Sequence, residues 1–190
     1  MALVLNGSAN TIGGLAVGGL PDGIVDTDMI ASSVTRVTMA DQWRVSTSQT
    51  TSSDTLADIT GWSRNNNNFA GIGSALTNSG ANFTFPSTGI YYIRYQIATY
   101  ITSGSSRYIS PRLYYNGQTI CITWSSLSHI SSHTTQVSGS QAILDVTNTS
   151  NTFKIQMQSE NPVVVLGNNE AGYSDTATMS DVVVIRLGDT

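Results

Sequence analysis

The sequence has little charge and few of the residues that disulfides and helices require. Of its 190 residues, 11% are charged, one is cysteine, one is lysine and two are glutamate. A single cysteine excludes an intrachain disulfide, because such a bridge needs two. Lysine and glutamate are strong helix formers, and their scarcity beside abundant β-branched residues disfavours helices. The composition therefore predicts an all-β protein.

Basic charge and long apolar runs are also missing. The formal net charge is −4, whereas a nucleic-acid-binding protein needs a basic face that displaces counterions. The longest apolar runs, such as Val163–Leu166, are far shorter than the roughly 20 residues that span a bilayer. The first residues have neither a basic n-region nor a long apolar h-region, so we expect no signal peptide. We expect no nucleic-acid partner, no membrane insertion and synthesis in the cytoplasm.

Residues 1–38 differ from the rest of the chain. They are rich in glycine, and the first aromatic residue of the sequence is Trp43. Glycine permits close backbone approach, and the segment also carries regularly recurring apolar residues that we expect to dock on a partner: Leu15, Val17, Leu20, Ile24, Val25, Met29 and Ile30. We interpret the segment as an extended attachment arm. The alternative is a disordered N-terminal tail.

Residues 39–190 carry the strand signals. The clearest is at 82–101, where a strand stops at Pro86, the chain turns at Gly89, and a long alternating segment follows. One face of that segment is the better candidate for the core: Ile93, Tyr95, Ile97, Thr99 and Ile101. Asn116-Gly117 is a strong hairpin signal. Eight to ten strands with short links predict a sandwich, jelly roll or barrel.

Two further strand predictions concern the last third of the chain. Residues 129–137 and 141–146 are expected to be separate short strands joined at Gly139. Val182–Ile185 is a continuous apolar run, which predicts a strand buried on both faces.

The stretch Phe83-Thr84-Phe85-Pro86-Ser87-Thr88-Gly89-Ile90-Tyr91 has the form F-x-x-P-x-x-G-x-Y. It resembles a strand pair of complement C1q and tumour-necrosis-factor-like domains, and the resemblance covers roughly residues 39–190. It implies a jelly-roll head that forms a tight homotrimer. On that basis we expect the second face of the long strand, with Tyr92 and Tyr100, to contribute to the trimer interface.

A second resemblance lies in the arm. Residues Gly18–Ala31 are similar to N-terminal segments of structural proteins from tailed bacteriophages, marine ones especially. This implies a protein of the virion surface, either a trimeric fibre or spike that contacts a host receptor or glycan, or a capsid decoration protein that stabilises the shell. A secreted lectin-like binding module is the further alternative.

The sequence offers weak candidates for a metal site. His129 and His133 are its two histidines, and a structural zinc needs four ligands. Asp22, Asp26 and Asp28 lie close together, but their spacing does not match the EF-hand loop. We therefore expect no metal and no cofactor, and we interpret these residues as surface side chains.

Candidates for catalysis are equally sparse. There is no Gly-x-Ser-x-Gly motif. Glu160 and Glu170 could act as a glycosidase pair only at a fixed separation in a deep cleft. Cys121 has no basic neighbour that would activate it, so a core thiol is expected. We expect the protein not to be an enzyme.

Aromatic residues beside polar loops are the better candidates for a binding surface, because they give rigid contact area with a polar handle. The candidates are Trp62, Arg64, Asn66, Tyr108 and Trp124. Trp62 is preferred because it precedes a run of four asparagines. The alternative is that the aromatic residues fill the core or the trimer axis.

Overall fold

The computed structural model describes residues 4–6, 11–13, 37–64, 70–129, 134–167 and 178–190. The chain divides into two compact units, Met1–Thr35 and Arg36–Thr190. In the first unit, β1 (Val4–Asn6) and β2 (Thr11–Gly13) form an antiparallel pair. The arm residues expected to dock on a partner, from Leu15 to Ile30, lie outside the described residues.

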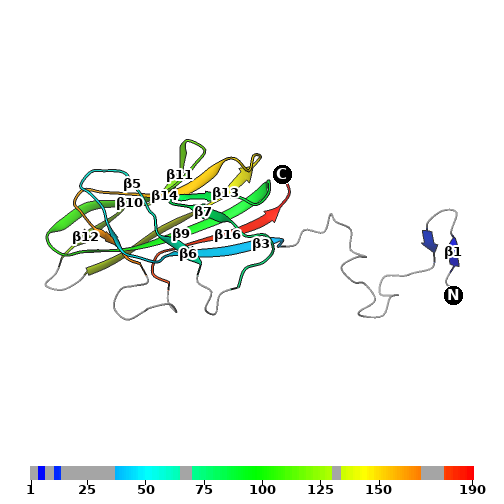
Figure 1. The fold of residues 1–190 in the computed structure, drawn as a ribbon, viewed down its shortest axis with the longest axis horizontal. Helices are drawn as coiled ribbons and strands as arrows, with labels where there is room; N and C mark the ends of the chain where they lie inside the picture. Colours follow the sequence, from blue (N-terminus) through cyan, green and yellow to red (C-terminus); the bar gives the residue numbers. More distant parts are fainter. Residues whose placement is uncertain (1–3, 7–10, 14–36, 65–69, 130–133, 168–177) are drawn as a thin grey trace. The chain divides into compact units, whose positions relative to one another are not determined.

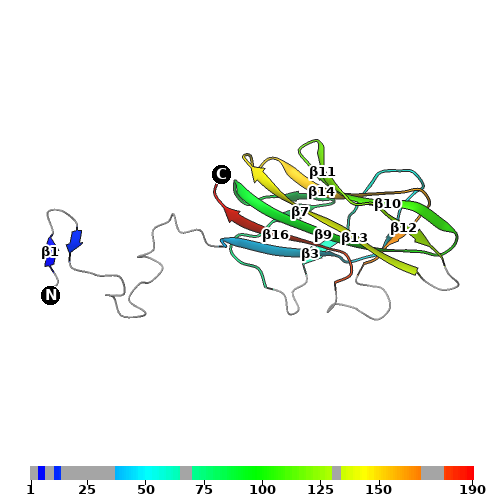
Figure 2. The same ribbon diagram turned by 180° about the vertical axis from the view of Figure 1, so that it is seen from behind.

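The second unit is a two-layered sandwich, and the described residues contain no helix (Figures 1 and 2). Its strands are β3 (Met39–Val45), β4 (Gln49–Thr50), β5 (Ala57–Asp58), β6 (Trp62–Arg64), β7 (Thr77–Ser79), β8 (Asn82–Thr84), β9 (Gly89–Ile101), β10 (Ser105–Tyr115), β11 (Gln118–Ile122), β12 (Ser125–Ser128), β13 (Thr134–Val146), β14 (Thr152–Ser159), β15 (Val164–Val165) and β16 (Asp181–Gly188). The all-β jelly-roll prediction is confirmed. The strands outnumber the expected eight to ten because several are only two or three residues long.

Each layer is a seven-stranded antiparallel sheet. The first, here called the β9 sheet, has the order β4-β15-β9-β16-β3-β6, with β13 paired to β9. The second, the β10 sheet, has the order β11-β10-β14-β8-β7, with β12 on β10 and β5 on β14. Apart from the hairpins β7–β8 and β10–β11, several neighbouring strands, such as β3 and β16, come from distant parts of the sequence, as expected for a jelly roll.

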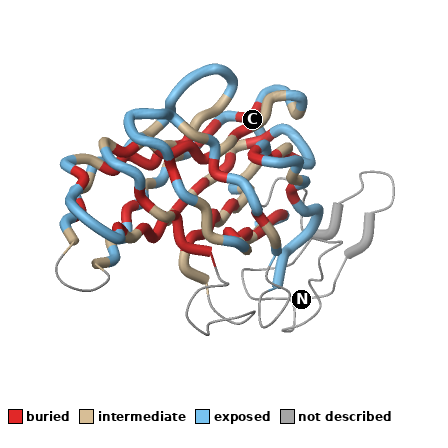
Figure 3. Tube along the Cα trace, turned by 60° about the vertical axis from the view of Figure 1, so that its left-hand side comes forward, coloured by how far each residue is buried: buried red, intermediate tan, exposed pale blue. Residues whose placement is uncertain are grey.

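Strand β9 shows why the chain folds into layers. Its residues alternate between a buried and a half-buried face, and the buried set is Tyr91, Ile93, Tyr95, Ile97, Thr99 and Ile101. These side chains enter the space between the sheets, where Figure 3 shows buried segments enclosed by exposed loops. The face predicted for the core is therefore confirmed, and Tyr92 and Tyr100 lie on the opposite face.

An aromatic cluster joins the two sheets. The rings of Phe83 and Phe153 in the β10 sheet stack with centroids 4.8 Å apart. Trp43 and Trp62 of the β9 sheet pack edge-on against Phe83, at centroid distances of 5.6 Å and 5.4 Å. Such packing adds to the stabilisation that these large side chains gain from burial. The cluster holds the layers together at this end of the core.

Asn116 and Gly117 form the predicted hairpin between β10 and β11, with φ angles of 45° and 82°. The prediction of two short strands joined at Gly139 is wrong, because β13 is continuous and Gly139 pairs with Gln96 of β9. A Cβ atom at Gly139 would lie 2.3 Å from the carbonyl oxygen of Tyr95. Glycine at this position permits the close approach of β9 and β13 instead of ending a strand.

Strand β16 contradicts the prediction of burial on both faces. Val182 and Val184 are fully buried, but Val183 and Ile185 are only partly covered. The reason is that the β10 sheet covers just one side of the β9 sheet. Apolar side chains of β16 are therefore left on the outer face.

Candidate binding surfaces

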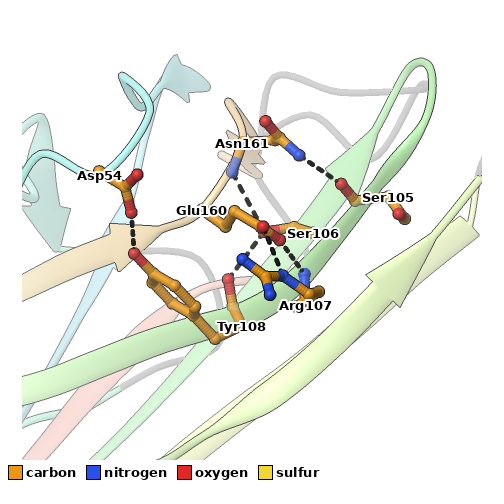
Figure 4. Close-up of polar contacts among 7 residues, drawn as sticks. All are labelled: Asp54, Ser105, Ser106, Arg107, Tyr108, Glu160 and Asn161. Atoms are coloured by element: carbon orange, nitrogen blue, oxygen red, sulfur yellow. Dashed lines mark hydrogen bonds and ion pairs between the residues drawn. The ribbon is translucent and has the colours of Figure 1, made fainter.

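The first candidate surface is the pair of aromatic rings Tyr108 and Trp124. Tyr108 lies on β10, and Trp124 lies between β11 and β12 with 62% of its surface exposed. The ring centroids are 5.3 Å apart at an angle of 58°. The Tyr108 hydroxyl donates a hydrogen bond to the Asp54 carboxylate (Figure 4). The sequence predicted both rings at a surface, and the structure brings them together.

Charged groups surround this aromatic pair. The Glu160 carboxylate accepts hydrogen bonds from the backbone N–H of Arg107 at 2.7 Å and from its Nε at 2.5 Å (Figure 4). These bonds lower the pKa of Glu160, whereas the bond to Asp54 raises the pKa of Tyr108. An exposed aromatic platform beside fixed donors and acceptors suits contact with a polar partner. The Arg107–Glu160 pair has no signal in the local sequence.

The structure moves one predicted binding residue, Trp62, away from the free surface. Trp62 is only 7% exposed and lies in the aromatic cluster, so its preferred role as an exposed contact is wrong. Its indole N–H donates to the carbonyl oxygen of Ile59 at 2.8 Å, after which the chain turns at Gly61, whose φ is 68°. This turn directs the side chain inward despite the polar sequence that follows. Asn66 lies outside the described residues.

The partly exposed side chain of Arg64 forms an ion pair with the buried Asp41. Its Nε and Nη2 atoms donate to the two oxygens of the Asp41 carboxylate at 3.1 Å and 2.9 Å, and its guanidinium lies 4.4 Å from the centroid of the Trp43 ring. Asp41 also accepts from the indole N–H of Trp43 and from the backbone N–H of Leu76, each at 3.0 Å. These contacts tie the segment that ends at Leu76 to β3, so Arg64 has a structural role.

The second candidate surface is the side of the β9 sheet that faces away from the core, here called the β9 outer face. It carries Tyr92, Tyr100, Val137, Ile143, Val183 and Ile185. Ile143 is 65% exposed and Val137 is 48% exposed. In the sheet register Tyr92 lies between Ile143 of β13 and Ile185 of β16. This row of apolar side chains is what a contact between protein surfaces needs.

Polar groups interrupt the β9 outer face. A hollow of about 420 Å³, lined in part by Arg94, Gln96 and Gln141, lies over Gly139. Arg94 donates to Gln96 at 2.6 Å and is 3.6 Å from the carboxylate of Asp181. Asp181 also accepts from Gln42 at 2.9 Å. These contacts order the centre of the face.

Asp181 provides a test of the electrostatics of this face. Its burial raises the pKa of the carboxyl above the ordinary 3.8, against the lowering effects of Gln42 and Arg94. Because the pKa of Asp181 is raised in the folded state, its carboxyl contributes most to the free energy of unfolding below pH 3.8, where it is protonated in both the folded and the unfolded chain. This contribution is lost as the pH rises through the pKa of the folded state. We therefore expect Asp181→Asn to raise the free energy of unfolding at neutral pH. Urea unfolding at neutral pH and at about pH 3 measures this, and a gain that does not shrink in acid would contradict it.

Two of the remaining sequence candidates lie among the described residues. His129 is partly buried just after β12, and Cys121 is a half-buried thiol packed against the core. Within the ranges that the structure describes, no group of three or more histidine, cysteine, aspartate or glutamate side chains is placed to hold a metal ion. The part of the chain that the structure describes holds no helix long and apolar enough to cross a membrane. His133, Glu170 and the three aspartates at 22, 26 and 28 lie outside the described residues.

Comparison with known proteins gives a result at the level of fold. No family model matches the chain, and no curated protein matches it. A solved structure of Eiger TNF from S. frugiperda is similar, with a TM-score of 0.56 and 17% identity, over 82% of this chain and 96% of that one. Murine APRIL at pH 5.0 is similar with a TM-score of 0.54 and 11% identity, over 78% of this chain and 98% of that one.

The PRD1 vertex protein P5 is a more distant match, with a TM-score of 0.45 and 15% identity, over 80% of this chain and 99% of that one. The conclusion about fold therefore rests on the first two structures. The chain has a TNF-like jelly-roll fold, as expected from the segment around Pro86.

Proposed function

We propose that this chain is a non-enzymatic binding or structural protein that forms a homotrimer through the β9 outer face. The observation that carries the proposal is the exposure of Ile143 and Val137 on a long, regular sheet. Apolar side chains gathered on one face of a sheet mark an interaction surface. The resemblance to trimeric C1q and TNF-like domains, together with the fold, favours a three-fold contact.

A closed three-fold ring needs two different surfaces on each copy that fit one another. Among the described strands, β13 pairs only with β9 in its sheet and lies beside β11 of the β10 sheet, where Ile120 and Ile122 are also exposed. This apolar edge gives one surface. The row formed by Tyr92 and Ile185 gives the other. Tyr92 retains the role that the sequence assigned to it, while Tyr100 lies further along the same face.

The proposal extends to what the trimer attaches to. The resemblance of Gly18–Ala31 to phage structural proteins supports a place on the surface of a virion, with residues 1–38 as the attachment arm. The Tyr108–Trp124 pair then serves as the contact to a host receptor or glycan. A capsid decoration protein is the alternative role. Electron microscopy of particles distinguishes the two, since density on the capsid shell favours decoration and density at the tail favours receptor binding.

The trimer itself is tested by the mass of the full chain in solution. Light scattering coupled to size exclusion should give about 61 kDa, three times the 20.2 kDa of one copy. The mass should persist on dilution into the low micromolar range, since a standard-sized interface supports such an affinity. A mass of one copy at high protein concentration would refute the proposal.

A further inference from the structure

A polar hollow lies at the end of the β10 sheet away from Tyr108. It has a volume of about 300 Å³, and its lining includes Asn82, Tyr114, Asn116, Asn151 and Lys154. We call it the Asn-lined hollow. Tyr114 and Lys154 are direct partners in the register of β10 and β14. Since Tyr114 is six residues beyond Tyr108 on the same strand, the two sites are about 20 Å apart.

Two tight turns form the walls of the hollow. Asn116 begins the hairpin turn after β10, and its backbone N–H donates to the carbonyl oxygen of Thr152 at 3.4 Å. In the turn before β14, the backbone N–H groups of Ser150 and Asn151 donate to the side-chain and backbone oxygens of Asn148, at 2.9 Å and 3.1 Å. Both turns are therefore fixed before any ligand arrives. Preformed walls reduce the ordering cost of binding.

The side chains of the hollow offer paired donors and acceptors. Among the described residues, the side-chain amides of Asn116 and Asn151 take part in no hydrogen bond with the protein. Each amide can donate through its NH₂ group and accept through its oxygen. A sugar hydroxyl likewise both donates and accepts, so the two sets of groups are complementary. The half-buried ring of Tyr114 adds an apolar surface on which the C–H face of a sugar can pack.

The charge in the hollow is balanced. The Lys154 ammonium donates to the Asp58 carboxylate at 2.8 Å and lies 5.4 Å from the centroid of the Tyr114 ring. The side-chain amide of Gln156 also donates to Asp58, at 2.8 Å. Burial acts to raise the pKa of the Asp58 carboxyl, but the hydrogen bonds from Lys154 and Gln156 outweigh it, so the pKa lies below its ordinary value. Asp58 is therefore ionised at neutral pH and cancels the charge of Lys154. A neutral ligand fits this environment better than an anion does.

We propose that the Asn-lined hollow binds a neutral monosaccharide, either free or as the terminal sugar of a glycan. The volume lies at the lower end of the range for small-molecule pockets, about 300 to 1,000 Å³, which suits a single sugar ring. The site lies within one copy of the chain and is separate from the Tyr108–Trp124 pair. It goes beyond the proposed function and does not depend on the trimer.

The experiment is ligand-observed saturation-transfer NMR on the full chain with glucose, galactose, mannose and N-acetylglucosamine, each tested alone. A ligand of about a dozen heavy atoms is expected to bind with a dissociation constant in the millimolar range. At least one of these sugars should show transfer. Tyr114→Ala should weaken its binding at least about tenfold, because the apolar surface for the ring is lost.

Asn116→Gly is the more specific test of the Asn-lined hollow. Glycine accepts the positive φ of this turn, so the variant removes the amide while keeping the backbone. It should lower the affinity several-fold and leave the circular dichroism spectrum unchanged. Ile72→Ala, at an exposed position outside both candidate sites, is the control and should bind as the parent does. Trp124→Ala tests separately whether the Tyr108–Trp124 pair contributes to the binding. Should Tyr114→Ala fail to fold, Asn116→Gly decides the result.

Three results would overturn the proposal. They are the absence of transfer from all four sugars, transfer that persists unchanged in Asn116→Gly, and binding that is lost in Trp124→Ala but kept in Asn116→Gly. The last result would place sugar binding on the Tyr108–Trp124 pair. None of these results bears on the mass of the trimer, so the two proposals are tested separately.

Discussion

Replacing Ile143 by arginine is expected to convert the proposed trimer into single copies. Ile143 is the most exposed apolar side chain on the β9 outer face, and it lies next to Tyr92 in the sheet register. A guanidinium at this position would be buried in each of the three contacts without a partner. An unpaired buried charge costs several kcal/mol, so the affinity between copies should fall by about a thousandfold or more.

Light scattering and analytical ultracentrifugation measure this effect directly. The expected mass of Ile143→Arg is that of one copy, 20.2 kDa, at concentrations where the parent has three times that mass. Leu56→Arg is the matched control, because Leu56 is also exposed but lies in the segment that precedes β5 of the β10 sheet. If Ile143→Arg kept the parental mass, the β9 outer face would not be the contact.

The second large effect is expected from Asp41→Ala, which should lower the free energy of unfolding by about 3 kcal/mol. The Asp41 side chain is 5% exposed and accepts hydrogen bonds from Trp43, Arg64 and Leu76. Its removal leaves the Leu76 N–H and the Trp43 indole N–H without their acceptor in the interior. The Arg64 side chain is 38% exposed and regains contact with water, which places the loss at the lower end of the range for a broken buried pair.

Urea unfolding at one fixed protein concentration measures the loss. Asp189→Ala is the matched control, because Asp189 pairs with Arg186 while its own side chain is 89% exposed. An exposed pair contributes about 0 to 1 kcal/mol, so this variant should unfold nearly as the parent does. Equal losses in the two variants would show that the buried carboxylate does not hold the segment before Leu76 to β3.

Much of the head could be predicted from local sequence. The alternation along β9 identified its buried face, because successive side chains of a strand point to opposite sides. Asn116-Gly117 identified a hairpin, because both residues tolerate the positive φ angles of that turn. The F-x-x-P-x-x-G-x-Y stretch indicated the TNF-like fold. Each of these signals lies within a short segment.

The candidate surfaces could be predicted only in part. Tyr108 and Trp124 were both expected to be exposed, but their contact joins β10 to the loop after β11, and the neighbouring Arg107–Glu160 pair joins residues 53 positions apart, so no short segment contains either contact. Trp62 was expected at the surface because polar residues follow it. Its burial depends on Phe83, which comes from the other sheet. No local pattern contains that information.

The order of residues thus determined that the chain forms strands, where the Asn116-Gly117 turn lies, and which side of β9 is apolar enough to enter a core. Only the folded sandwich decided that Val183, Ile185 and Ile143 remain outside. The physical reason is that the β9 sheet has two faces with apolar side chains and a single partner sheet. Which face is covered is settled by how the layers pack, and the face left over is the one that we propose contacts other copies.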